Sequence, residues 1–154
     1  MPEHLRIPFR KWRRWPPDSR LAIAFARNAR AFHGMAWRTD NRVDTQSAYH
    51  SAIAIELGLK AYLLHRGFSD DWTRVWLRHD VSKALRSVRM LGFQGVPDGI
   101  AELAAALSPL YSSGALRSGA KPGLPLPPDV ADQAICDLLS AVEAAIKIDS
   151  GTDR

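Results

Sequence analysis

Apolar residues recur every three or four positions through most of the chain, which is the spacing of amphipathic α-helices. The clearest helix runs from about Ser47 to His65, and its apolar stripe is wide enough to be contacted on several sides. The stripe contains Ala48, Ala52, Ile55, Leu59 and Leu63, with Ile53, Leu57 and Leu64 beside it. Gly67 should end this helix, because glycine favours the conformation that closes helices. Glu56 and Lys60 lie on the same helix and should be paired with each other or with neighbours if both are internal.

The same periodicity predicts four further helices and one short helical segment, and residues that favour helix ends mark their limits. In chain order these are a helix from Asp18 or Ser19 to Gly34 or the 39–41 cluster, a short segment from Ser69 or Asp70 to Leu77, a helix capped by Asp80 and closed by Gly92, a helix from about Asp98, and a last helix from Pro128 or Asp129. Pro109 should kink or end the helix that begins near Asp98. Val130 should begin the buried side of the last one. No segment predicts a strand, so we expect an all-α fold.

Composition divides the chain into three parts. Residues 1–17 are expected to form an extended arm, because the prolines at its end resist helix formation. Residues 18–149 form one helical domain, in which the Gly-, Pro- and Ser-rich stretch 112–128 is a loop, and residues 150–154 form a tail. A chain of 154 residues suits one domain, and its 46% apolar and 24% charged residues are an ordinary balance for a globular protein.

No apolar run approaches the roughly 20 residues that span a bilayer, and no uninterrupted apolar segment follows the basic N-terminus as in a signal peptide. We therefore expect a cytoplasmic protein without a membrane partner. The single cysteine, Cys136, has no partner for an intrachain disulfide and is expected to be a buried structural thiol. His4, His33, His50 and His65 show no metal-ligand spacing, and the sequence has no glycine-rich phosphate loop. We therefore expect no metal and no cofactor.

Positive charge is concentrated at the start of the chain. Residues 1–42 hold ten Lys or Arg and three Asp or Glu, whereas residues 43–154 hold eleven and thirteen. The arm alternates basic and aromatic side chains through Arg10, Lys11, Trp12, Arg13, Arg14 and Trp15. Aromatic rings can stack on bases while Arg and Lys neutralise phosphate, so the arm is predicted to bind RNA or another anionic partner. The alternative is that its tryptophans pack onto the helical domain and leave the charges in water.

The central helix and the segment after it resemble a known superfamily. The stretch Ala52-Ile-Ala-Ile-Glu56-Leu-Gly-Leu-Lys60-Ala-Tyr-Leu-Leu-His-Arg-Gly67 is followed by His79-Asp80-Val81 and by Leu85, and later by Tyr111 and Arg117. This order of an E-L-x-L-K-x-x-L helix, a glycine, a loop and an H-D-hydrophobic segment resembles prokaryotic HEPN domains. The later tyrosine and arginine resemble the Y-x-x-x-R-Y stretch of many members. The resemblance covers roughly residues 19–148.

The resemblance implies a four- to five-helix up-and-down bundle that often pairs as a homodimer. It leaves three functions open. The first is a module that binds RNA, a nucleotide or a cognate protein partner. The second is a metal-independent endoribonuclease of the defence or toxin type. The third is a non-catalytic subunit of a toxin–antitoxin or nucleotidyltransferase pair.

Arg74 and His79 have the Arg-x4–6-His spacing that the resemblance associates with ribonuclease activity. A neutral imidazole can take the proton of a ribose 2′-hydroxyl, and a guanidinium can hold the phosphate, for which Arg78 is a further candidate. On a regular helix Arg74 and His79 would lie about 140° apart, so they converge only if the helix breaks before Asp80 or a second subunit completes the site. The structural alternative is a solvated row of ion pairs formed by Asp70, Arg74 and Arg78, with His79 packed beside the Asp80 cap.

Overall fold

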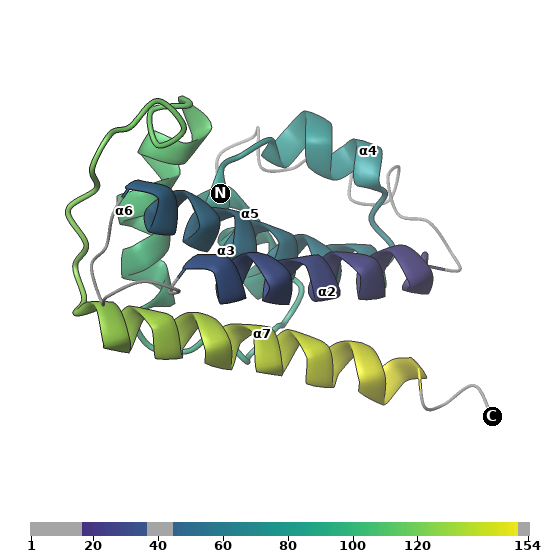
Figure 1. Cartoon of the computed structure of the whole chain (residues 1–154). Coiled ribbons are helices and arrows are strands. Elements are labelled where there is room, and N and C mark those ends of the chain that lie inside the picture. The colour runs from purple at the N-terminus through teal and green to yellow at the C-terminus, as the bar shows by residue number, and fades with distance from the viewer. Residues whose placement is uncertain (1–16, 37–44, 151–154) are drawn as a thin grey trace.

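The computed structural model describes residues 17–36 and 45–150 (Figure 1). Its helices are α2 (Ser19–Ala36), α3 (Thr45–His65), α4 (Asp70–Trp72), the π-helix η2 (Thr73–Leu77), α5 (Val81–Met90), α6 (Ile100–Ser112) and α7 (Pro128–Ser150). These described residues contain helices and loops but no strand, so the predicted all-α class is confirmed. None of the helices among them combines the length and the apolarity that crossing a bilayer requires.

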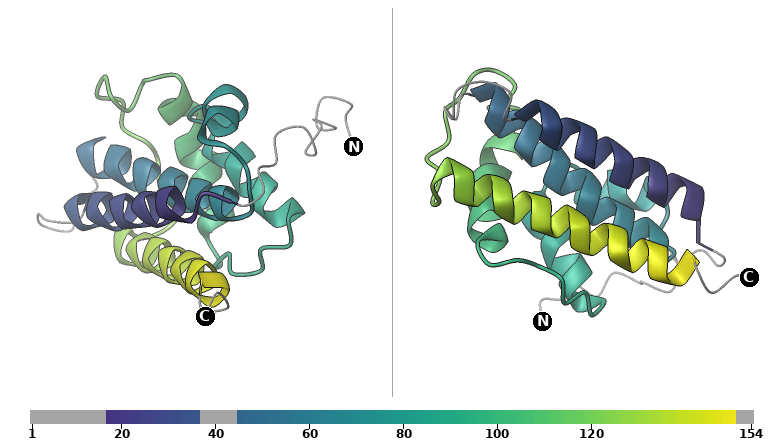
Figure 2. Two further views of the ribbon diagram at one scale, coloured as in Figure 1. Left: turned by 90° about the vertical axis from the view of Figure 1, so that its right-hand side faces the viewer. Right: turned by 60° about the horizontal axis from the view of Figure 1, so that its bottom comes forward.

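Three long helices lie side by side and form the frame of the molecule (Figures 1 and 2). Helices α2 and α3 form an antiparallel pair, α7 lies along both, and α6 runs steeply across their direction. Helix α3 contacts α2, α7, α5 and α6, which explains why its apolar stripe is so wide. The central position predicted for the helix around residues 47–65 is therefore confirmed.

Small residues allow the long helices to approach closely. The buried side of α2 consists of Ala22, Ala26 and Ala29, whereas its larger apolar side chains are only partly buried at the edges of the contact. At Gly58 of α3, a Cβ atom would lie 2.6 Å from Cδ2 of Leu139 on α7. Since Leu139 is itself buried, α7 packs against α3 at a distance that a larger residue at this position would disturb.

Arg30 of α2 ties this helix to α7 through polar contacts. Its Nε lies 2.7 Å from Oε1 of Glu143, and its Nη2 donates to the hydroxyl of Ser140 at 2.7 Å. Its Nη1 lies 3.4 Å from Sγ of Cys136. The cysteine is thus a half-buried free thiol beneath a guanidinium, and it is less enclosed than the sequence predicted.

Two predicted helix ends, those at Asp18 and Gly67, are confirmed. The carboxylate of Asp18 accepts the backbone N–H of Leu21 at 3.0 Å and so caps α2. Gly67 has a φ of 98°, and the N–H groups of residues 67 and 68 bind the carbonyls of Leu64 and Leu63. This pair of bonds is the Schellman motif, which closes α3 at the glycine that the sequence singled out.

Of two details predicted for the helices, the burial of Val130 is wrong. Pro109 does not end α6, which continues to Ser112, and the alternative that it kinks this helix stays a prediction. The carbonyl that loses its partner to this proline belongs to Ala105, an exposed residue, so water can satisfy it. Val130 is 46% exposed, and Ala131 and the residues that follow it at helical spacing form the buried side of α7.

Candidate functional site

A buried carboxylate, that of Glu56 on α3, gathers three polar side chains from different parts of the chain. Glu56 is 5% exposed. Its Oε1 accepts a hydrogen bond from Nζ of Lys60 at 2.5 Å, and its Oε2 accepts one from the hydroxyl of Tyr111 on α6. Nδ1 of His79 lies 3.2 Å from Oε2 and 3.3 Å from Oε1. Three elements therefore meet on one carboxylate at the centre of α3.

Lys60 is the positive partner in this cluster, and it is buried as deeply as Glu56. It is 6% exposed, and besides the carboxylate its Nζ binds the backbone carbonyl of Arg78 at 3.0 Å. A buried ammonium needs several oxygen partners to offset its lost hydration. The expectation that Glu56 and Lys60 would pair if internal is confirmed, and the second bond joins the pair to a loop.

Tyr111 supplies a neutral donor to the same carboxylate. Its burial, followed by the nearby charge of Glu56, raises the pKa of its hydroxyl above the ordinary value of 10.0. The hydroxyl therefore stays protonated at physiological pH and donates a hydrogen bond to Glu56. The ring of Tyr111 also lies beside that of His79, with 5.1 Å between the ring centroids.

Arg78 and His79 are the central residues of a tight turn between η2 and α5. The N–H of Asp80 binds the carbonyl of Leu77 at 2.9 Å and closes the turn. Arg78 has φ 50° and ψ −122°, which are close to the first central position of a type II′ turn. That position favours glycine, and among the described residues other than glycine only Arg78 has a positive φ. This conformation directs the Arg78 carbonyl to Lys60.

Replacing Arg78 by glycine should therefore stabilise the fold. A non-glycine residue in this region costs roughly 1–3 kcal/mol, and the extra freedom of glycine in the unfolded chain offsets about 0.5–1 kcal/mol of the gain. We expect a net increase of about 1 kcal/mol in the free energy of unfolding, measured by urea denaturation. Arg78→Ala is the matched control, because it removes the same guanidinium but keeps the strained Cβ. Equal stability of the two variants would contradict the strain.

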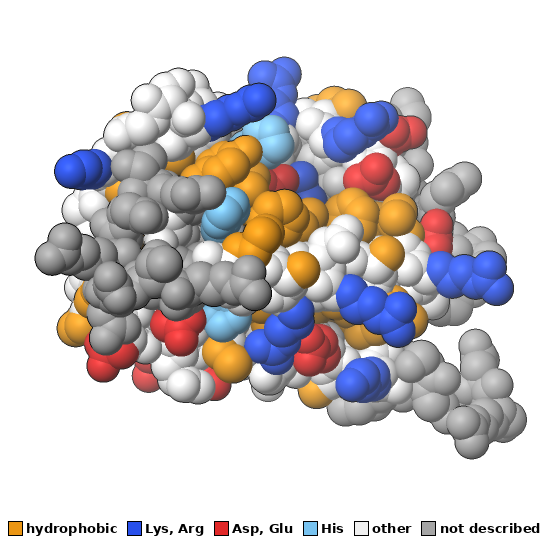
Figure 3. Space-filling view, viewed as in Figure 1, with side chains coloured by type: hydrophobic (Ala, Val, Ile, Leu, Met, Phe, Trp, Pro, Cys, Tyr) orange, Lys and Arg blue, Asp and Glu red, His pale blue; other side chains and the backbone are white. Residues whose placement is uncertain are grey.

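His79 is held on the buried carboxylate but remains open to solvent. Its side chain is 62% exposed. A carboxylate only accepts hydrogen bonds, so in the neutral form of the ring Nδ1 carries the hydrogen and Nε2 has the lone pair. A histidine fixed in this way by a carboxylate has the arrangement of a general base. Figure 3 draws one face of the molecule, on which histidine side chains lie next to hydrophobic ones and Lys and Arg side chains lie above and below them.

Asp80 fixes the far end of the turn and confirms its predicted role as a cap. Its Oδ1 accepts the N–H of Lys83 at 2.9 Å and also the hydroxyl of Ser108 on α6 at 2.9 Å. The first bond starts α5, and the second joins α5 to α6. The residue after His79 therefore has a structural function, and the turn is anchored at both ends.

The structure gives Arg74 and His79 different partners. Nη2 of Arg74 pairs with the carboxylate of Asp71, and the Arg74 side chain is 67% exposed. The expected pair with Asp70 is therefore replaced by one with the neighbouring aspartate, while Asp70 lies near the hydroxyl of Thr73. The helix does break before Asp80, as convergence of Arg74 and His79 requires, but no bond joins the two side chains. A catalytic role for Arg74 stays a prediction.

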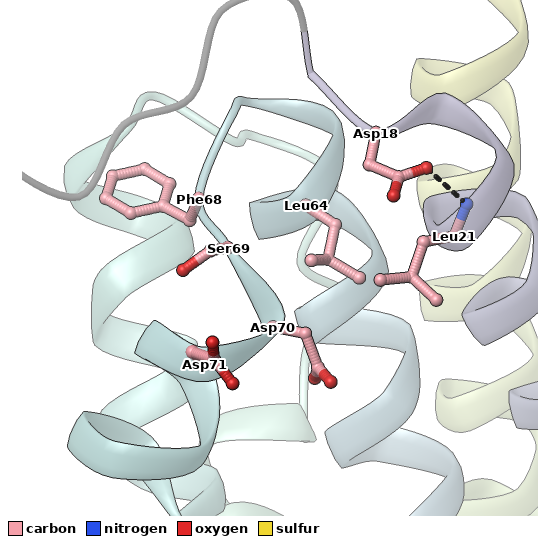
Figure 4. Close-up of a pocket in the computed structure, with 7 residues that line it drawn as sticks. All are labelled: Asp18, Leu21, Leu64, Phe68, Ser69, Asp70 and Asp71. Carbon is pink, nitrogen blue, oxygen red and sulfur yellow. Dashed lines mark hydrogen bonds between the residues drawn. The ribbon is translucent and has the colours of Figure 1, made fainter.

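A hollow of about 110 Å³ lies between the start of α2 and α4 (Figure 4). Its polar lining is acidic and comes from Asp18, Asp70 and Asp71, beside the hydroxyl of Ser69. Asp18 and Ser69 cap their helices, and Asp71 pairs with an arginine. Three carboxylates repel a phosphate, so this hollow is not a candidate for binding nucleic acid.

The predicted nucleic-acid-binding arm, with Arg10, Lys11, Trp12, Arg13, Arg14 and Trp15, lies outside the described residues. In the part of the chain that the structure describes, no group of three or more His, Cys, Asp or Glu side chains is placed to hold a metal ion. Compared with models of protein families, with curated proteins and with solved structures, the sequence shows no match.

Proposed function

We propose that the chain is a HEPN-like RNA-binding protein that cleaves single-stranded RNA with His79 as general base. The observation that carries this proposal is an exposed imidazole fixed through Nδ1 on the buried carboxylate of Glu56. Lys60 and Tyr111 hold that carboxylate in place from the other sides. Catalytic bases in proteins are commonly oriented by a third group in this way.

The arrangement of the motif residues supports the same proposal. Glu56 and Lys60 belong to the helix segment that resembles HEPN domains, and His79 and Asp80 belong to the second segment. In the fold, hydrogen bonds join the first three residues in one cluster, and Asp80 anchors the turn that carries the histidine. An active centre where the two segments meet would explain why the sequence contains both of them.

The chemistry needs one base and one phosphate-binding cation. Nε2 of His79 takes the proton of the ribose 2′-hydroxyl, and the 2′-oxygen forms a bond to the adjacent phosphorus. The bond from phosphorus to the 5′-oxygen breaks, and that oxygen takes a proton from water. Glu56 stabilises the imidazolium that forms. Arg78 is next to His79 and exposed, so its guanidinium is the nearer candidate for holding the phosphate, with Arg74 as the alternative.

The test is incubation of the purified protein with single-stranded RNA in the presence of EDTA. The expected products carry a 2′,3′-cyclic phosphate on one fragment and a 5′-hydroxyl on the other. A DNA oligonucleotide of the same sequence lacks the attacking hydroxyl and should remain intact, and a His79→Ala preparation controls for contaminating nucleases. Cleavage of the DNA as well, or no cleavage of the RNA, would overturn the mechanism.

Binding measured alongside cleavage separates the other functions that the HEPN resemblance implies. RNA that is bound but not cut would point to a non-catalytic RNA-binding module. RNA that is neither bound nor cut would favour a subunit that docks a cognate protein. The homodimer expected from the resemblance stays a prediction, which light scattering of the purified chain can test.

A further inference from the structure

An open groove of about 440 Å³ lies beside the turn that carries His79. Its lining includes Val75, Trp76, Arg78, Asp80, Lys83 and Ser112. Its volume is within the range of roughly 300–1,000 Å³ that small-molecule sites occupy in proteins. Because Arg78 and Asp80 belong both to the groove and to the turn, a ligand in the groove would lie next to the candidate base.

The groove offers an aromatic surface, the ring of Trp76, that no hydrogen bond from its Nε1 to a described residue holds in place. The indole of Trp76 is half-buried, and its Nε1 is buried without a hydrogen-bond partner among the described residues. Indole N–H groups in protein interiors usually have such a partner. The ring can therefore shift to meet a ligand without breaking a hydrogen bond.

An apolar side chain and two cations line the groove together with this ring. Val75 is 57% exposed and leaves a large apolar surface at the edge of the groove. Nζ of Lys83 lies 6.0 Å from the ring centroid of Trp76, and Arg78 lines the same groove. The carboxylate of Asp80 is already bound to Ser108 and to a backbone N–H. The groove thus combines an aromatic face with a positive charge that exceeds the negative one.

We propose that this groove binds the base and the phosphate of the nucleotide next to the bond at which His79 acts. The base stacks on Trp76 and covers Val75, while Lys83 and Arg78 contact the phosphate. The ligand is single-stranded RNA, because a base within a duplex is already stacked on both faces. The inference rests on the proposed function, since it assigns the substrate of that same site.

The probe for the groove is a fluorescein-labelled hexauridylate with 2′-O-methyl groups, which is single-stranded and cannot be cleaved by attack of a 2′-hydroxyl. Its dissociation constant is measured by fluorescence anisotropy. Stacking on one aromatic ring is expected to make binding by Trp76→Ala roughly 10- to 100-fold weaker, while Trp76→Phe keeps most of the affinity. Unchanged binding by Trp76→Ala would overturn the proposal, as would equally tight binding of the same oligomer in a duplex.

Two substitutions at exposed positions guard against misfolding of the tryptophan variant. Val75→Glu places a carboxylate at the edge of the groove and should weaken binding at least tenfold, because it repels phosphate. Val130→Ala changes an exposed apolar residue on α7 and should bind like the wild type. Equal affinity of Val75→Glu and Val130→Ala would contradict the placement of RNA in the groove.

The groove and the catalytic proposal can fail separately. If the wild type binds the uncleavable oligomer through Trp76 but leaves unmodified RNA intact, the groove stands and the catalytic role of His79 falls. If the wild type cleaves RNA and Trp76→Ala cleaves it with unchanged KM and kcat, the catalytic role stands and the groove falls. A raised KM with a nearly unchanged kcat in Trp76→Ala is the result that supports both.

Discussion

Replacing His79 by alanine is expected to slow RNA cleavage by roughly 10²- to 10⁴-fold, which is the usual contribution of a positioned general base. The loss should appear in the rate at saturating RNA, because the imidazole acts on the proton that moves and not on the binding of the strand. The fold should tolerate the change, since the ring is largely exposed and Glu56 keeps its bonds to Lys60 and Tyr111.

The measurement is a single-turnover cleavage rate over a range of pH. The wild-type rate should depend on pH, as general-base catalysis does, and the His79→Ala rate should lack that dependence. Arg74→Ala and Arg78→Ala, compared at the same pH, show which guanidinium holds the phosphate. A His79→Ala rate equal to that of the wild type would remove this residue from the mechanism.

Replacing Glu56 by glutamine is expected to lower the free energy of unfolding by about 3–5 kcal/mol. The change leaves the ammonium of Lys60 buried at 6% exposure without its carboxylate. The neutral amide of glutamine can still accept a hydrogen bond, but it does not balance the charge. Since small domains are stable by only about 5–15 kcal/mol, the variant would lose a large share of its stability.

Urea denaturation with two controls isolates the buried charge as the cause. Combining Glu56→Gln with Lys60→Met removes both charges and should recover much of the stability. Asp71→Asn breaks the exposed pair with Arg74 and should cost less than about 1 kcal/mol. A Glu56→Gln variant within the range of the Asp71→Asn variant would contradict the burial and pairing described for Lys60.

The sequence predicted those parts of the fold that depend on neighbouring residues. Asp18, Gly67 and Asp80 act within a few positions of the helix ends that they form, so their roles can be read from the local order. Val130 was misplaced because the start of α7 buries alanines, beginning with Ala131, which contribute little to a hydrophobic pattern.

The candidate site was harder to predict because it depends on distant contacts and on an irregular backbone. Tyr111 and Glu56 are 55 positions apart, and nothing in the local sequence links them. The regular-helix estimate for Arg74 and His79 does not apply, because residues 73–77 form a π-helix and Arg78 takes a positive φ without being glycine. The clues in the sequence are a Glu and a Lys within an unusually apolar helix, and the HEPN resemblance, whose motifs include His79 and Tyr111.

The bond from Lys60 to the Arg78 carbonyl changes how an exposed loop can move. If the turn opened by itself, the buried ammonium would lose one of its two oxygen partners while the core around it stayed closed. Local opening is favourable where few buried contacts are lost, and here the loss falls on a buried charge. The turn should therefore open only together with α3. This surface segment would then resist opening as strongly as the hydrophobic core does.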